Sequence, residues 1–245
     1  MKPTRILFCV VLLTVSAGVA HSQNGCARLS WDTCDPWVQD KTFSGPGLYR
    51  VVESMSGLTD PNVGTDSQIS FPFLFGGTPD AWRFDANGCQ TGTQLSVSGS
   101  GAPGCPAMGS NPQTSYQFSY DTYLGTVSLH LTSSYSEFTP SPATRYTLWQ
   151  ITFDHSYSSV GPSPPDNSTC GGAQLSGQLN FDFAQVTPAS GPPINLPPCD
   201  VHMEGFCGYL TWNGGMLTDH LGGPCSPVPV PVLPATWGRL KSLYR

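Results

Sequence analysis

Basic residues are scarce in this chain of 245 residues. It has 10 lysines and arginines against 16 aspartates and glutamates, which gives a formal net charge of −6 at pH 7. Only five basic residues lie between Gly25 and Thr236. An acidic body of this kind repels nucleic-acid phosphates, and no basic stripe compensates. The composition therefore argues against nucleic acid as a partner.

Long hydrophobic runs are also lacking, since no segment approaches the roughly 18 apolar residues of a membrane helix. The N-terminus has two basic residues, then an apolar run from Ile6 to Leu13, then small residues. This order is typical of a secretory signal peptide. We expect cleavage after Ser22 and an exported product without a transmembrane segment, located outside the cell, on its surface or in the periplasm.

Familiar catalytic motifs are absent as well. The sequence has no HExxH, no histidine pair at helical spacing and no G-x-S-x-G nucleophile elbow. His130 is out of phase with Val127 and Leu129, so we expect it to be exposed on a strand. Asp154 and His155 end another strand, where loops of a sandwich often form sites. They are the catalytic alternative, together with acids on neighbouring loops, and would serve a secreted hydrolase or lyase.

Two segments match metal sites only in part. The stretch "CDVHMEGFC", which begins at Cys199, lacks the ligand spacing of a zinc finger. Asp60, Asn62 and Asp66 place oxygen ligands at even spacings around a glycine, which suits calcium. That pattern lacks the glutamate at position twelve of an EF-hand. We expect no cofactor and no metal, with this calcium site as the alternative.

Cysteines, by contrast, are plentiful. Eight remain beyond the signal peptide, and an even number in an exported chain predicts four disulfides. They are Cys26, Cys34, Cys89, Cys105, Cys170, Cys199, Cys207 and Cys225. Sequence alone does not select one connectivity. Because the cysteines form neighbouring couples, we predict the local pairs Cys26–Cys34, Cys89–Cys105, Cys170–Cys199 and Cys207–Cys225.

Hydrophobic residues alternate with polar ones along most of the chain. A period of two marks strands with one buried face. The aligned sets are Ile69, Phe71, Phe73 and Phe75; Val127, Leu129 and Leu131; Trp149, Ile151 and Phe153; and Leu179, Phe181 and Phe183, with Asp182 turned outward. The 27 glycines and 24 prolines supply the turns between strands. We predict an all-β fold, a disulfide-stapled antiparallel β-sandwich of the jelly-roll or immunoglobulin-like type.

The end of the chain differs from the rest. We assign residues 1–22 to the signal peptide, 23–225 to the sandwich, 226–236 to a proline-rich linker and 237–245 to a basic tail. After Thr236 as N-cap, the tail forms a short amphipathic helix in our prediction. Its recognition residues are Trp237, Arg239, Leu240, Lys241, Leu243, Tyr244 and Arg245. We expect export or attachment machinery to bind this tail.

Several fragments resemble a family of uncharacterised secreted bacterial proteins. They are "LSWDTC", "DKTFS", "AWRFDANGCQTGTQLSVS", "YTLWQITFDH", "YLTWNGG" and, most specifically, the final "TWGRLKSLYR". The resemblance implies an exported bacterial protein and supplies no activity.

The function predicted from these features is that of an exported interaction or surface module with a C-terminal sorting tail. Its ligand is an extracellular or cell-surface molecule. Glycans are candidates because Trp82, Trp149 and Trp212 could stack on sugar rings. The alternative is the secreted hydrolase or lyase that would use Asp154 and His155.

Overall fold

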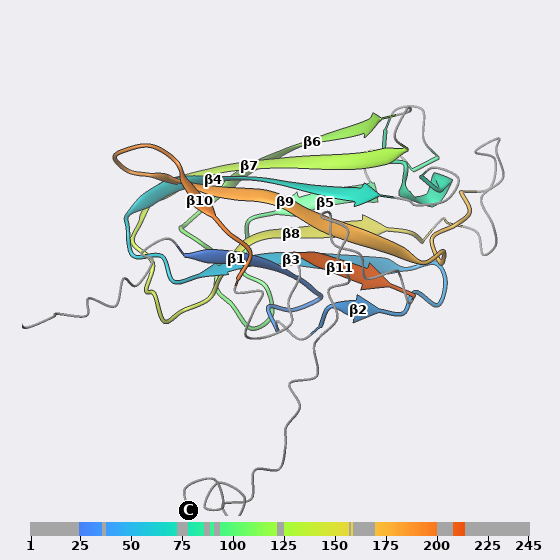
Figure 1. Ribbon diagram of the computed structural model, residues 1–245, viewed down its shortest axis with the longest axis horizontal. Helices are drawn as coiled ribbons and strands as arrows, with labels where there is room; N and C mark the ends of the chain where they lie inside the picture. The colour runs from blue at the N-terminus through green and yellow to red at the C-terminus, as the bar shows by residue number, and fades with distance from the viewer. Residues whose placement is uncertain are drawn as a thin grey trace, which may run out of the picture.

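Two β-sheets packed face to face form the body of the protein (Figure 1). The computed structural model describes residues 25–35, 38–72, 78–85, 89–90, 94–121, 125–156, 158, 170–199 and 208–213. Within these ranges helical structure is limited to 3₁₀ turns, of which η1 (Asp80–Trp82) is complete. No helix in the described part of the chain is long and apolar enough to cross a membrane. The predicted all-β sandwich is confirmed.

The smaller sheet contains four strands in the order β1-β3-β8-β5. They are β1 (Cys26–Trp31), β3 (Leu48–Ser56), β8 (Tyr146–Asp154) and β5 (Leu95–Ser98). The larger sheet has seven strands, with β2-β11-β9-β4-β7-β6 in line and β10 beside β9. They are β2 (Asp40–Lys41), β11 (Tyr209–Trp212), β9 (Gly177–Pro188), β4 (Asn62–Pro72), β7 (Thr126–Phe138), β6 (Gln113–Asp121) and β10 (Ile194–Leu196). Every named pair is antiparallel except β2 with β11.

The predicted inward faces of β7 and β8 are confirmed. Val127, Leu129 and Leu131 are buried, as are Trp149, Ile151 and Phe153. Between the sheets lies an aromatic cluster in which Trp82 stacks on Trp212 with ring centroids 4.5 Å apart. Trp31, Trp82, Trp149 and Trp212 are all at most 1% exposed. The three tryptophans considered as sugar platforms therefore belong to the core.

Along β9 the predicted alternation holds only as far as Asp182. Leu179 and Phe181 are buried and Asp182 is exposed. On β4, however, Gln68 pairs with Phe183 and the next residue, Ile69, pairs with Phe181. Asp182 is therefore an extra residue, and such a bulge changes which face the following residues occupy. Ala184 is buried instead of Phe183, so the prediction for Phe183 is wrong.

The disulfides differ from the predicted local pairs. Cys26 is bonded to Cys199, Cys34 to Cys105 and Cys89 to Cys170, across sequence separations of 173, 71 and 81 residues. Sandwich strands pair mainly with partners that are distant in sequence, so neighbouring cysteines are carried to different places. The predictions Cys26–Cys34, Cys89–Cys105 and Cys170–Cys199 are wrong. Cys207 and Cys225 lie outside the described residues.

Gly177 is required where β9 meets β11. It lies directly opposite Trp212, and a Cβ atom there would overlap the indole ring. We expect Gly177→Ala to lower the free energy of unfolding by about 2 kcal/mol, because the buried ring has no space to move. Gly47→Ala is the control, since its Cβ would meet Tyr49 at an ordinary 3.7 Å. Equal urea midpoints for the two variants would contradict this account.

Candidate interaction surface

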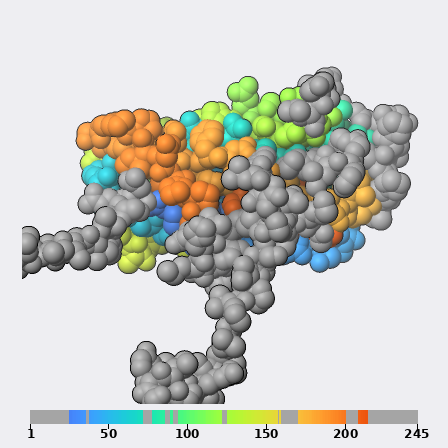
Figure 2. Space-filling view, in the orientation of Figure 1, coloured from blue at the N-terminus to red at the C-terminus, as the bar shows by residue number. Residues whose placement is uncertain are grey.

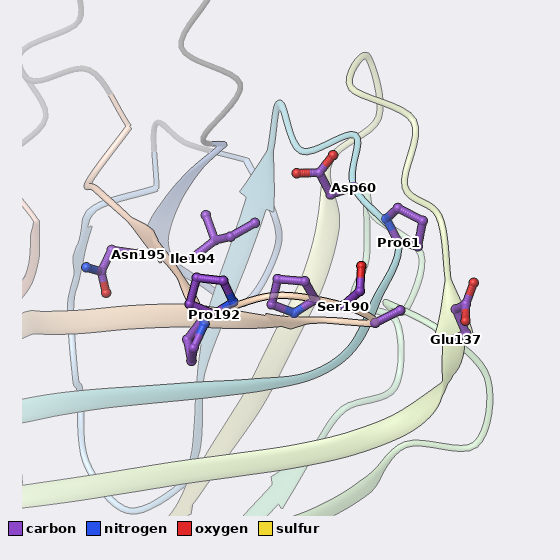
Figure 3. Close-up of a pocket in the computed structure, with 10 residues that line it drawn as sticks. Asp60, Pro61, Glu137, Ser190, Pro192, Ile194 and Asn195 are labelled. Atoms are coloured by element: carbon purple, nitrogen blue, oxygen red, sulfur yellow. The ribbon is translucent and has the colours of Figure 1, made fainter.

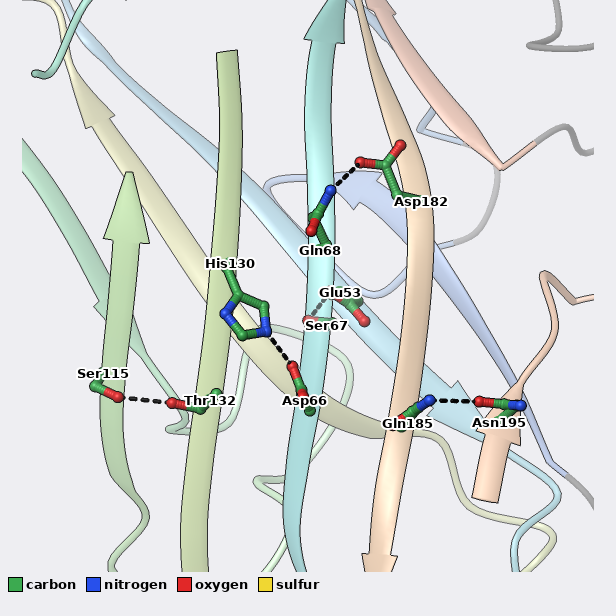
Figure 4. A network of polar contacts seen from close by, with 10 residues as sticks. All are labelled: Glu53, Asp66, Ser67, Gln68, Ser115, His130, Thr132, Asp182, Gln185 and Asn195. Carbon is green, nitrogen blue, oxygen red and sulfur yellow. Dashed lines mark hydrogen bonds and ion pairs between the residues drawn. The ribbon is translucent and has the colours of Figure 1, made fainter. Parts of the chain in front are cut away.

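The side of the larger sheet that faces away from the smaller sheet carries a row of polar side chains that bond across strands (Figure 4). We call this set of side chains the outer face. It comprises Ser115 on β6, His130 and Thr132 on β7, Asp66, Gln68 and Ser70 on β4, Asp182 and Gln185 on β9, and Asn195 on β10. These residues come from five adjacent strands, so the surface they form is broad rather than a deep cleft.

Cross-strand contacts hold these side chains in place. His130 Nε2 lies 2.6 Å from Asp66 Oδ1, with the two side chains 41% and 38% exposed. Ser115 and Thr132, which face each other in register, have hydroxyl oxygens 2.7 Å apart. Gln185 Nε2 donates to Asn195 Oδ1 at 2.7 Å. The predicted exposure of His130 is confirmed, and its pairing with Asp66 was not foreseen.

The bulge on β9 adds a charge to this surface. Asp182 accepts hydrogen bonds from Ser70 Oγ at 2.8 Å and from Gln68 Nε2 at 3.2 Å. The half-buried ring of Phe183 lies beside His130, with centroids 6.1 Å apart. The residue shift that moved Phe183 out of the core therefore brings an aromatic ring next to the histidine.

Basic residues are absent from the five strands that carry the outer face. Strands β4, β6, β7, β9 and β10 contain no lysine or arginine, whereas they carry Asp66, Asp121, Glu137 and Asp182. The lysines and arginines in the described part of the chain are Arg28, Lys41, Arg50, Arg83 and Arg145. They lie on β1, β2 and β3, directly after η1, and in the loop before β8. The outer face is consequently acidic.

A groove of about 960 Å³ opens at one end of the larger sheet (Figure 3). The β9–β10 hairpin forms one wall and is orange in Figure 2. Backbone Ala189 N donates to Pro61 O at 2.8 Å and so fixes the hairpin against the β3–β4 connection. The lining residues are Asp60, Pro61, Glu137, Pro188, Ala189, Ser190, Pro192, Pro193, Ile194 and Asn195. Four prolines make the walls stiff, and two carboxylates supply charge.

The groove and the outer face are continuous. Asn195 lines the groove and also accepts the hydrogen bond from Gln185. A ligand that lies across the strands can therefore reach the carboxylates of Asp60 and Glu137. Sequence reasoning missed the groove because its walls come from three separate parts of the chain.

The structure does not join Asp154 and His155 into a catalytic pair. Asp154 accepts a hydrogen bond from Ser156 N at 2.9 Å, and bonds from Ser156 lower the pKa of this carboxyl. His155 is 0% exposed, and burial lowers the pKa of its imidazole to about 4. Successive strand residues point to opposite faces, so the carboxylate and the ring diverge. Asp154 and His155 therefore cannot act together as the catalytic pair of a hydrolase.

The aromatic core surrounds His155 closely. The rings of Tyr49, Trp82, Phe84 and Phe153 have centroids between 4.7 and 6.4 Å from the imidazole. The only hydrogen-bond contact of the ring among the described residues is Nδ1 with Ser158 Oγ, at 3.3 Å. A neutral, enclosed imidazole of this kind is a packing residue.

The three calcium candidates are not brought together either. Asn62 is fully buried and its Oδ1 accepts from Tyr135 Oη at 2.5 Å, whereas Asp66 is on the outer face with His130. The register of β4 shifts between Asn62 and Gly64. Because of that bulge, residues on either side of it that are an even number of positions apart point to opposite faces of the sheet. Asn62 and Asp66 are therefore on different faces. In the described part of the chain no three His, Cys, Asp or Glu side chains gather as metal ligands.

Sequence reasoning also missed a buried acid, Glu53 on β3. It is fully enclosed, and burial raises the pKa of its carboxyl to about 8. Ser67 Oγ of the facing sheet donates to Oε2 at 3.0 Å. The alternation along β3 could have revealed it. Glu53 lies two residues after Val51 and four after Tyr49, so it is on the same buried face as both. The predicted tail, Trp237–Arg245, lies outside the described residues.

These features define a disulfide-linked, largely antiparallel β-sandwich with one acidic, polar sheet face. No family model matches the sequence, and the search of curated proteins found no match. Among solved structures the chain is similar to the second type II cohesin module of the cellulosomal adaptor ScaA scaffoldin of Acetivibrio cellulolyticus. That match has 14% identity and a TM-score of 0.37, and it covers 70% of this chain and 89% of that one.

Two further cohesins are similar at the same level. A non-cellulosomal cohesin of Archaeoglobus fulgidus has 8% identity and a TM-score of 0.31, covering 71% of this chain and 86% of that one. A type II cohesin domain from the cellulosome of Acetivibrio cellulolyticus has 9% identity and a TM-score of 0.35, covering 71% and 95%.

Proposed function

We propose that this chain is an exported interaction module that binds a basic, extended protein segment along its outer face and into the groove. The observation that carries the proposal is the absence of basic residues from the strands of the outer face. Five adjacent strands lack lysine and arginine, and they lead to the carboxylates of Asp60 and Glu137. A basic segment would find opposite charges in the groove and hydrogen-bonding side chains on the outer face.

Export is supported by the cysteine chemistry. The described part of the chain holds three disulfides, which persist in oxidising compartments and are rare in the cytosol. The resemblance to secreted bacterial proteins points in the same direction. The C-terminal segment is then a recognition tag in our proposal.

A protein ligand fits this surface better than a glycan. Sugar-binding sites commonly use an exposed tryptophan or tyrosine as a stacking platform. Every tryptophan in the described part of the chain is buried in the core, and no tyrosine belongs to the outer face or the groove lining. Prolines and cross-strand hydrogen bonds make the surface rigid, which lowers the entropy cost of binding an extended peptide.

The proposal is tested with a fluorescent peptide of residues 226–245, the densest basic segment in the sequence. Anisotropy should show saturable binding to the full-length protein that weakens with salt. The variant Asp60→Asn/Glu137→Gln should bind about tenfold more weakly, since it removes both groove charges. A peptide with Arg239→Glu, Lys241→Glu and Arg245→Glu should not bind.

The matched control is Asp35→Asn/Asp154→Asn, which removes two acids elsewhere, after β1 and at the end of β8. It should bind the peptide as the parent does. If the groove variant retains the affinity of the parent, the groove is not the binding site and the proposal fails.

A further inference from the structure

Strand β6 is an open edge of the larger sheet. In the described part of the chain it pairs with β7 alone, over all nine residues from Gln113 to Asp121. Figure 1 shows it at the margin of the sheet, with β7 on its inner side. An edge strand presents backbone N–H and C=O groups to which another strand can bond.

The usual protections of an edge are missing from β6. Its sequence, QTSYQFSYD, contains no lysine, arginine or proline, and its single charge is at the last residue. Proteins commonly protect edges by short strands, inward charges, prolines or bulges. This strand has nine residues, pairs with β7 without a register shift and has exposed or half-exposed side chains throughout.

An aromatic strip follows the inner face of β6. Tyr116, Phe118 and Tyr120 alternate along it, and Tyr116 is 38% exposed, one of few large apolar side chains so open in the described part of the chain. The strip is held in place: Tyr116 Oη donates to Leu95 O at 3.1 Å, and the Arg83 guanidinium lies 4.6 Å from the Tyr120 ring centroid. This fixed strip is left partly open to solvent at the side of the sandwich.

The five central residues of β6, SYQFS, are nearly the same when read from either end. Around Gln117, Ser115 matches Ser119 and Tyr116 matches Phe118. The outer pairs are Thr114 with Tyr120 and Gln113 with Asp121. Gln117 is also the midpoint of the strand, so an antiparallel pair centred there uses all nine residues, and any other centre loses some. No two like charges would face each other.

We propose that two copies of this chain associate through their β6 strands, antiparallel and in register at Gln117. The pairing makes about nine backbone hydrogen bonds and continues the larger sheet from one copy into the next. It also places Tyr116 of each copy beside Phe118 of the other, which covers the aromatic strip.

The register is tested by a new cysteine in the full-length protein. In the proposed register, position 117 of one copy faces position 117 of the other. The two Cα atoms are about 5 Å apart, so Gln117→Cys brings two cysteines within disulfide range. Mild oxidation should therefore give a covalent dimer on a non-reducing gel, at least about tenfold more than the parent protein gives. Ser119→Cys alone should not crosslink, because two Ser119 positions are about 13 Å apart along the strand. Mixing Ser119→Cys with Ser115→Cys should restore the crosslink.

Association itself is measured by sedimentation. Gln117→Lys brings two like charges face to face and should raise the dissociation constant by about tenfold or more. Thr187→Lys introduces the same charge on β9, three strands from the edge, and should leave the dissociation constant unchanged. A parent protein that stays monomeric at about 100 μM, or equal crosslinking by Gln117→Cys and Ser119→Cys, would overturn the proposal. Neither outcome bears on peptide binding in the groove, which β6 does not line.

Discussion

Replacing Cys26 and Cys199 together with serine is expected to lower the free energy of unfolding by about 3–5 kcal/mol. This bridge closes the longest loop among the described disulfides, with a sequence separation of 173 residues. A long loop restricts the unfolded chain most, so its removal releases the most conformational entropy. Urea unfolding without reductant measures the change.

Ser56→Ala is the control for local packing. The hydroxyl of Ser56 lies 3.8 Å from Cys26 Sγ, so this variant alters the surroundings of the bridge and keeps the bridge itself. Its effect should stay within about 1 kcal/mol. Peptide mapping of the unreduced parent should recover Cys26 joined to Cys199. Recovery of Cys26 with Cys34, or an unchanged urea midpoint in the double serine variant, would contradict the prediction.

The parent protein is expected to lose about 2 kcal/mol of stability between pH 6.5 and pH 8, because of Glu53. Burial raises the pKa of this carboxyl from 4.5 to about 8 in the folded chain. In that pH range the folded protein keeps the proton and the unfolded chain has lost it. The stabilising contribution is therefore complete below pH 4.5 and disappears as the pH rises through 8.

His155 acts in the opposite direction at lower pH. Burial lowers its pKa from 6.5 to about 4, so the folded protein holds it neutral while the unfolded chain takes up a proton. Its contribution is complete above pH 6.5 and is lost as the pH falls towards 4. From these two groups we expect a nearly flat stability between pH 4.5 and 6.5, followed by the decline due to Glu53.

Glu53→Gln separates the two contributions. The amide has no charge to bury, so stability should rise from pH 4.5 to 6.5 and then stay level to pH 8. Urea unfolding at these three pH values is sufficient. If parent and variant lose the same stability between pH 6.5 and 8, the decline does not come from Glu53.

The strands were predictable because their signal is local. Alternation along β7 and β8 correctly identified the buried faces, since each residue needs only its neighbours two positions away. The same rule continued by one step would have put His155 inside with Phe153. Alternation fails at the two bulges, because an inserted residue shows only when the partner strand is known. Phe183, Asn62 and Asp66 were misplaced for this reason.

The candidate site was less predictable than the fold because it depends on pairing between distant segments. Asp66 and His130 had each been noticed separately, for calcium and for exposure. The sequence does not show that β4 lies beside β7, and only that pairing brings His130 within hydrogen-bond distance of Asp66. The same holds for the groove. Asp60 lies in the β3–β4 connection, Glu137 near the end of β7 and Pro192 in the β9–β10 hairpin, so three distant segments form it.

The bridge between Cys26 and Cys199 also sets an order of events during synthesis. A chain that enters an oxidising compartment from its N-terminus exposes Cys26 and Cys34 long before Cys199. The first disulfide available to it is the consecutive one, which the finished protein does not contain. For a chain exported in this way, the native pairing is reached either by delayed oxidation or by disulfide exchange. In the export proposed above, β1 cannot be bonded to its final partner Cys199 until nearly all of the sandwich has entered the oxidising compartment.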